Sequence, residues 1–215
     1  MLIWQLIDSA FPSGSFAHSL GLEAAYQAGE VCTDDALRRF LTGLLWQTGH
    51  AVLPLVTATH THPERLEELD ALCDAFLTNA IANRASRVQG RTLAAACTRI
   101  WPSAELAALD ARVRRTFAHQ GPVIGAALRT LQVRLDVAQH MTLFLASRGV
   151  LAAAVRLGLA GPFRAQQLQH ECAREIGAVL RRCASLDESQ LAHTAPVLEL
   201  LQSSHDRLYS RLFQS

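Results

Sequence analysis

The amino-acid sequence predicts an all-α protein, a single domain over residues 1–215 built as a bundle of roughly eight to ten helices at the usual ~11–12 residues per helix. Long stretches repeat apolar residues at the spacing of a helix face. Strand signals are scarce, because Ala and Leu dominate and neither Asn-Gly nor Asp-Gly occurs. Half of the residues are hydrophobic, which is enough for a sizeable core.

The first half of the chain shows helix start signals followed by apolar stripes. Thr33, with two acidic residues behind it, provides a cap and a favourable first turn, and Pro54 ends or kinks the helix that follows. Pro63 and Ser103 open later segments in the same way. The expected helical segments are 33–53, 63–77, 79–99 and 103–117.

The second half begins at Gly121-Pro122, which we interpret as a break. Residues 123–157 are apolar on most sides, which predicts two or three central helices. Residues 164–183 form an amphipathic helix with basic residues near its negative end. Pro196 opens a last helix, expected to continue through Leu212.

Composition and charge exclude several classes of function. All 20 basic residues are Arg, so the chain has no P-loop lysine and cannot itself be an ordinary P-loop NTPase. A net charge of +1 argues against a nucleic-acid binder. No apolar run reaches ~18 uncharged residues, so no membrane span is expected. Five Cys without a C-x-x-C indicate neither a disulfide framework nor a zinc finger, and the expected location is a reducing cytoplasm.

Two pairs of residues could carry chemistry, and each has a structural alternative. Ser15 and His18 could serve a hydrolase, but the G-x-S-x-G pattern is missing and a serine here more simply caps the following helix. His60 and His62 could reach one metal ion from a loop before Pro63. Metal sites need three or four ligands, and the alternative is a pair of solvated loop histidines.

Three arginines form one basic stripe on a predicted helix, because Arg84, Arg87 and Arg91 recur at i, i+3 and i+7. A solvated face is the commoner outcome of such a pattern. The alternative is a contact with carboxylates or phosphates of a partner, for which the guanidinium fork is suited. Since no catalytic constellation emerges, the residues alone indicate a helical domain that acts by binding rather than as an enzyme.

Both ends of the chain carry distinctive motifs: residues 8–23 read DSAFPSGSFAHSLGLE and residues 208–215 read LYSRLFQS. The first resembles the opening signature of the UreF family of urease accessory proteins, and the second resembles the closing motif of that family. Three middle stretches resemble the family more loosely, so that the resemblance covers nearly the whole chain: 84–91, 119–125 and 153–166.

The resemblance implies an all-helical, typically homodimeric protein without a catalytic centre or a stably bound cofactor. It implies a complex with the accessory protein UreD (also called UreH) and the GTPase UreG, which alone binds GTP. That assembly delivers nickel to the urease apoenzyme. A chain without lysine agrees with a separate GTPase, because it cannot supply the Walker lysine.

The resemblance also indicates which residues contact partners. The tail 208–215 is expected to order against UreD/UreH with Arg211 as its anchor, unless it simply closes the last helix onto the core. Two different roles stay open beside the scaffold: a nickel carrier that ligates metal through His60, His62 or His18, and a small hydrolase using Ser15 and His18. The expected partner contacts are Phe16, His18, Glu23, Arg84, Arg87, Arg91, Tyr209, Arg211 and Phe213.

Overall fold

Three helices begin at polar caps in the computed structural model, which describes residues 1–14 and 17–214. The Thr33 hydroxyl accepts the N–H of Ala36, the Asn79 carbonyl accepts two backbone N–H groups, and Ser103 caps in the same way. These bonds satisfy donors that a helix leaves unpaired in its first turn. The helices that begin here are α3 (Asp34–Ala51), α6 (Ala80–Ile100) and α7 (Ala104–Val113).

The described residues contain further α-helices and short 3₁₀ turns but no strand, which confirms the predicted all-α class. The 3₁₀ turns lie at 63–65, 188–190 and 205–207. No helix in this part of the chain is both long enough and apolar enough to cross a bilayer. The further helices are α1 (Leu2–Leu6), α2 (Leu22–Gln27), α4 (Leu53–Thr61), α5 (Leu66–Phe76), α8 (Gln120–Thr130), α9 (Leu135–Arg156), α10 (Pro162–Cys183) and α11 (Pro196–Ser203).

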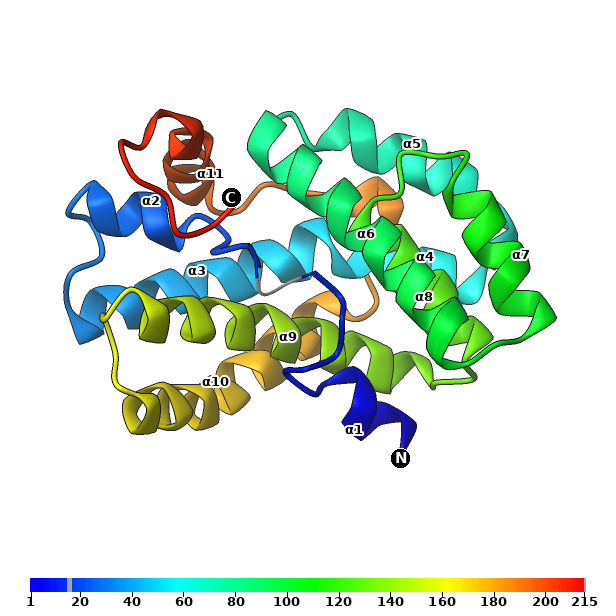
Figure 1. Ribbon diagram of the computed structural model, residues 1–215, viewed down its shortest axis with the longest axis horizontal. Helices are drawn as coiled ribbons and strands as arrows, with labels where there is room; N and C mark the ends of the chain where they lie inside the picture. Colours follow the sequence, from blue (N-terminus) through cyan, green and yellow to red (C-terminus); the bar gives the residue numbers. More distant parts are fainter. Residues whose placement is uncertain (15–16, 215) are drawn as a thin grey trace.

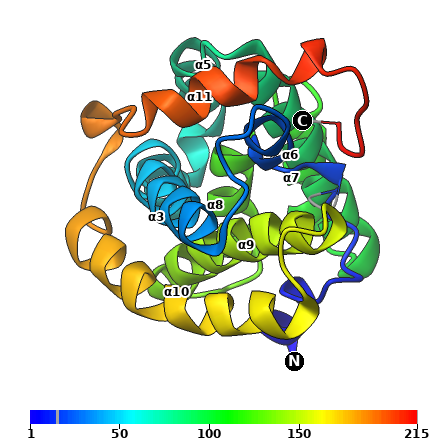
Figure 2. The ribbon, with the colours of Figure 1, turned by 90° about the vertical axis from the view of Figure 1, so that its left-hand side faces the viewer.

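The long helix α9 runs through the middle of the bundle, with α3 and α10 packed against it (Figures 1 and 2). It buries side chains over most of its length, from Ala138 to Ala154, as the apolar pattern predicted. Helices α4 and α8 cross beside it, and α5, α6 and α7 cover α8. Helices α2 and α11 lie together at the other end of the molecule, next to the C-terminus.

Two glycines allow helices and a bend to approach more closely than any side chain would permit. A Cβ at Gly125 of α8 would lie 2.1 Å from the Thr59 hydroxyl of α4. A Cβ at Gly90 of α6 would lie 2.0 Å from the Ala118 carbonyl oxygen. Both positions therefore require glycine for packing rather than for backbone freedom.

Three local expectations are wrong. Gly121-Pro122 lies inside the first turn of α8, because a proline there loses no helix hydrogen bond. His60 belongs to α4 rather than to a loop. The last helix ends at Ser203, because the backbone beyond it turns away and bonds to the distant side chain of Glu23.

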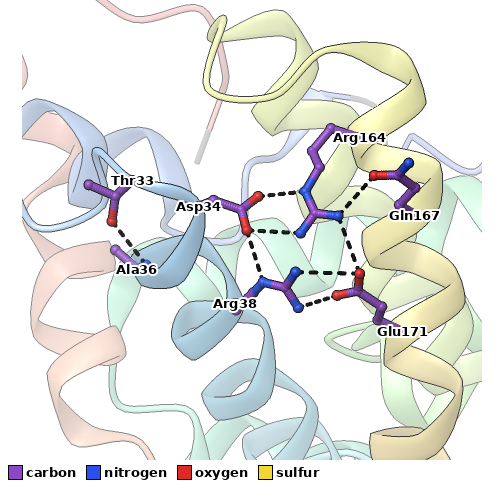
Figure 3. A network of polar contacts seen from close by, with 7 residues as sticks. All are labelled: Thr33, Asp34, Ala36, Arg38, Arg164, Gln167 and Glu171. Carbon is purple, nitrogen blue, oxygen red and sulfur yellow. Dashed lines mark hydrogen bonds and ion pairs between the residues drawn. The ribbon is translucent and has the colours of Figure 1, made fainter.

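A surface ion-pair network joins the start of α3 to α10 (Figure 3). Asp34 accepts two hydrogen bonds from Arg164, at 2.7 and 2.8 Å, and one from Arg38 at 2.9 Å. Glu171 bonds to both arginines in turn. Hydrogen bonds from Arg164 and then Arg38 hold the pKa of Asp34 well below its usual range. All four side chains are 30–45% exposed, so the network contributes modestly to stability.

Candidate functional site

The C-terminal tail lies against the segment that leads into α2, whereas the N-terminus itself lies apart, beside α1 (Figure 1). The backbone N–H of Gln214 donates to the carbonyl of Ala17 at 2.7 Å. The Gln27 side-chain amide, at the end of α2, donates to the carbonyl of Ser210 at 2.8 Å. The segments that carry the two most distinctive sequence motifs therefore form one site.

A buried carboxylate connects these segments. Glu23, in the first turn of α2, is 1% exposed and accepts the N–H of Leu212 at 2.6 Å and that of Phe213 at 3.2 Å. His205 is fully buried and places its Nε2 3.0 Å from the same carboxylate. We name Glu23, His205, Leu212 and Phe213 the terminal latch. Its bonds replace the helical pairing that the tail gives up.

The latch is packed from both sides. Phe213 belongs to the main core cluster, and the guanidinium of Arg156 lies 4.1 Å from its ring centroid. Gly21 has a φ of +88°, and a Cβ there would meet Gln202 of α11 at 3.1 Å. Gly21 thus supplies both a left-handed turn and room for α11 next to α2.

His18 lies close to the latch and is 4% exposed. Burial lowers the pKa of His18, and the nearby His205 lowers it further, so the ring is held neutral. His18 also lines a cavity of about 200 Å³ together with His193 and Glu199. The motif therefore places this histidine in the interior of the protein, next to the latch.

The tail turns one side inward and the other outward. Phe213 is buried, whereas Tyr209 is fully exposed and Leu212 is 60% exposed. Arg211 is exposed and forms a 3.2 Å ion pair with Asp206. The side chain of Phe213 thus packs onto the core, as the alternative to partner docking expects. Docking of the tail on a partner stays a prediction, now for its outward side chains.

Three residues expected to contact partners are instead buried in this protomer. Glu23 and Phe213 belong to the latch, and His18 lies beside it, because the motif residues satisfy one another across the two ends. Their side chains would reach a partner only if the latch opened. Phe16, expected at an interface, and Ser15, the hydrolase candidate, lie outside the described residues.

The two histidines proposed as metal ligands, His60 and His62, have different surroundings. His60 is 4% exposed and its Nε2 lies 2.7 Å from the carbonyl oxygen of Val133. His62 is exposed beyond the end of α4 and pairs with Glu64 at 3.2 Å. Among residues 1–14 and 17–214, no group of three or more His, Cys, Asp or Glu side chains could hold a metal ion. The expectation of two solvated loop histidines is therefore wrong for His60.

A Ser–His–Asp arrangement that the sequence did not reveal lies between α5, α6 and α8. His119 is fully buried, with Nδ1 3.1 Å from the Ser86 hydroxyl and Nε2 3.0 Å from a carboxylate oxygen of Asp74. The Ser86 hydroxyl also accepts the N–H of Gln120 at 3.0 Å. Asp70 completes the set, because it accepts the N–H groups of both Ala118 and His119.

These side chains hold the bend before α8 in place, and we name them the His119 clamp. Burial lowers the pKa of His119 despite Asp74, so the ring is neutral, donating to Asp74 and accepting from Ser86. The Ser86 hydroxyl accepts a backbone N–H at the start of α8, and Ser86 also lines the cavity of about 200 Å³ that His18 lines. Ala118, with a φ of +69°, is held in a strained bend by these bonds and by the close approach of Gly90. Ser86, Gly90 and His119 of the middle motifs thus have a packing role.

The arginine stripe lies on α6 along a surface groove of about 540 Å³. Arg84 forms a 3.0 Å ion pair with Asp206, next to the latch. The guanidinium of Arg87 lies 5.2 Å from the Phe117 ring centroid. The structure thus places the stripe close to the C-terminal segment, which no spacing rule could predict.

Comparisons with known proteins agree on one family. A family model described as UreF matches residues 31–173. Urease accessory protein F of Oryza sativa subsp. indica is 34% identical over 98% of this chain and 83% of its own length. The Arabidopsis thaliana protein of the same name is 33% identical over 99% and 91%. Urease accessory protein UreF of Arthrobacter sp. (strain FB24) is 30% identical over 100% and 96%.

Proposed function

The chain belongs to the UreF family of urease accessory proteins, and from this premise we propose that it is a non-catalytic, homodimeric scaffold for nickel insertion. A role in urease maturation, alongside other maturation factors, follows from the family. In the proposal the scaffold binds UreD/UreH and recruits and regulates UreG. Nickel is the delivered cargo and GTP is bound by UreG, since this chain offers no P-loop lysine.

The observation that supports this role is the orientation of the tail. Chain ends are usually disordered unless they are tied down. Here Glu23 ties down residues 212–213, so Tyr209 and Arg211 project from a fixed base. Tyr and Arg are enriched among residues that dominate binding energy, and pre-ordering the tail lowers the entropy lost on binding. The outward side of the tail therefore suits a docking site for UreD/UreH.

A second exposed surface supports association. Val197 and Leu200, three residues apart on α11, are 64% and 69% exposed. A chain of net charge +1 with exposed apolar side chains has little electrostatic repulsion to oppose self-association. This composition fits a protein that buries surface against a second copy or another subunit.

Co-purification and urease activation test the proposal. The variants are Tyr209→Ala and Arg211→Ala, and the control is Arg207→Ala, an exposed arginine of the same segment. We expect wild type and control to retain UreD/UreH, recruit UreG and restore urease activity in a strain lacking its own factor. Arg211→Ala should lose UreD/UreH while its thermal melt stays unchanged.

Retention of UreD/UreH by Arg211→Ala and Tyr209→Ala at wild-type levels would reject the docking role of the tail. Equilibrium dialysis of the purified chain with nickel addresses the carrier hypothesis. A scaffold binds no stoichiometric nickel, whereas a carrier would bind it and lose it in His60→Ala or His18→Ala.

A further inference from the structure

The groove on α6 has a basic wall and an apolar floor. At 100° per residue, Arg84, Arg87 and Arg91 fall within about 60° of the helix circumference. Val88, 41% exposed, and Leu77 contribute apolar surface between them. Arg84 and Arg91 are separated by about 10 Å along the helix axis, which is the length of about three residues of extended chain.

The arginines carry an excess of positive charge. Arg84 is paired with Asp206, and Arg87 is held over Phe117. Arg91 is exposed, and within the described part of the chain no hydrogen bond or ion pair engages its guanidinium. Asp74, the other nearby carboxylate, is already used by His119 and Asn83.

One arginine of the groove is already paired with a carboxylate of this chain. Both oxygens of Asp206 lie within 3.0–3.1 Å of Nη2 of Arg84, and the same carboxylate bonds to Arg211. Arg84 and Asp206 are 54% and 44% exposed, so the pair contributes at most about 1 kcal/mol to stability and is readily exchanged for another carboxylate. The pair with Asp206 shows that the Arg84 guanidinium is placed to bind a carboxylate.

We propose that this groove binds an acidic segment of a partner protein. Two or three Asp or Glu side chains meet Arg84, Arg87 and Arg91, and an apolar side chain of the same segment contacts Val88. The inference deepens the proposed function and rests on it for the existence of a partner. A peptide is favoured over nucleic acid, because the chain has a net charge of +1 and the groove floor is apolar.

Fluorescence anisotropy with a labelled hexaglutamate peptide tests the groove directly. We expect salt-sensitive binding to the full-length chain that weakens about tenfold in Arg91→Glu, which removes one arginine contact and adds a repulsive charge. Arg99→Glu is the matched control, an exposed arginine on the same helix outside the groove. Asp206→Asn should bind a few-fold more tightly, because it frees Arg84 from its internal carboxylate.

Three results would overturn the proposal: no peptide binding at low salt, an equal loss in Arg99→Glu, or preferential binding of a short single-stranded DNA. Urease activation is measured on the same variants so that the two proposals fail separately. If the wild type binds the peptide but does not activate urease, the scaffold function is rejected and the proposal of an acid-binding groove is retained. Activation by the wild type without any peptide binding would reject only the groove.

Discussion

Removal of the Glu23 carboxylate tests whether the latch ties the ends together. Glu23→Ala takes away the acceptor of three donors: the buried N–H of Phe213, the buried Nε2 of His205 and the partly buried N–H of Leu212. No other acceptor is bonded to these groups in the described residues. The variant therefore leaves buried polar groups unpaired rather than merely creating a small cavity.

The expected cost follows from the number of orphaned groups. Each buried donor left without an acceptor costs about 1–3 kcal/mol, and the tail can move to rehydrate some of them. We expect a loss of about 3–5 kcal/mol, which for a chain of this size lowers Tm by roughly 6–20 °C. Glu23→Gln should lose less, about 1–3 kcal/mol, because its amide oxygen can still accept from one side.

Thermal melts and limited trypsin digestion measure the two consequences. In Glu23→Ala, cleavage after Arg207 and Arg211 should precede global unfolding, because the tail is released first. Glu30→Ala, which removes an exposed carboxylate just beyond α2, is the control and should behave as wild type. A Glu23→Ala protein that melts within about 0.5 °C of wild type, with an unchanged digestion pattern, would refute the latch.

Further predictions concern packing, burial and the surface network. Gly90→Ala should lower stability in urea by about 3 kcal/mol or prevent folding, because its Cβ would meet the Ala118 carbonyl oxygen at 2.0 Å. Gly149→Ala, whose Cβ would make only an ordinary contact with Leu20 at 3.9 Å, should gain about 0.5–1 kcal/mol. Because burial lowers the pKa of His119, the unfolded chain binds its proton at higher pH than the folded chain, and Tm should fall as pH drops below 6.5, less steeply in His119→Gln. Because Arg164 and Arg38 lower the pKa of Asp34, the ionised Asp34 should stabilise the fold above about pH 4, and this stabilisation should be lost below that pH. Asp34→Asn should lower the free energy of unfolding by no more than about 1 kcal/mol at pH 7, and by less in high salt.

Local chemistry made much of the fold predictable. A Thr or Ser cap and an amphipathic stripe decide a helix within a few residues, so the starts of α3 and α7 and the extent of α10 follow from the sequence. The end of α11 does not follow, because the apolar spacing continues to Leu212 while the backbone there bonds to Glu23, 189 positions away. The burial of His60 does not follow from the sequence either, because its ring bonds to the carbonyl of Val133, which is 73 positions away.

The sequence singled out Glu23 and Phe213 as partner contacts, but it indicated neither His205 nor Leu212 nor the way these residues assemble. The motifs identified both ends of the chain, yet nothing in their spacing indicates that Glu23 meets His205 or that Asp206 meets Arg84. One signal was available for Glu23, an acidic residue within the apolar run Leu20–Ala25, where a carboxylate requires buried donors. The His119 clamp offered no comparable signal, because its members are separated by 33 and 45 positions.

The 3₁₀ turn at 205–207 links the latch, the tail and the groove. Its first residue, His205, points inward to Glu23, and its second, Asp206, points outward to Arg84 and Arg211. Arg84 and Arg211 bond to the same carboxylate oxygen, so an acidic ligand that takes Arg84 changes the surroundings of Arg211. Linkage requires the effect to be reciprocal: a partner that engages Arg211 must alter the affinity of the groove by the same factor. If both proposed surfaces bind partners, the shared carboxylate of Asp206 couples them without any large movement of the helices.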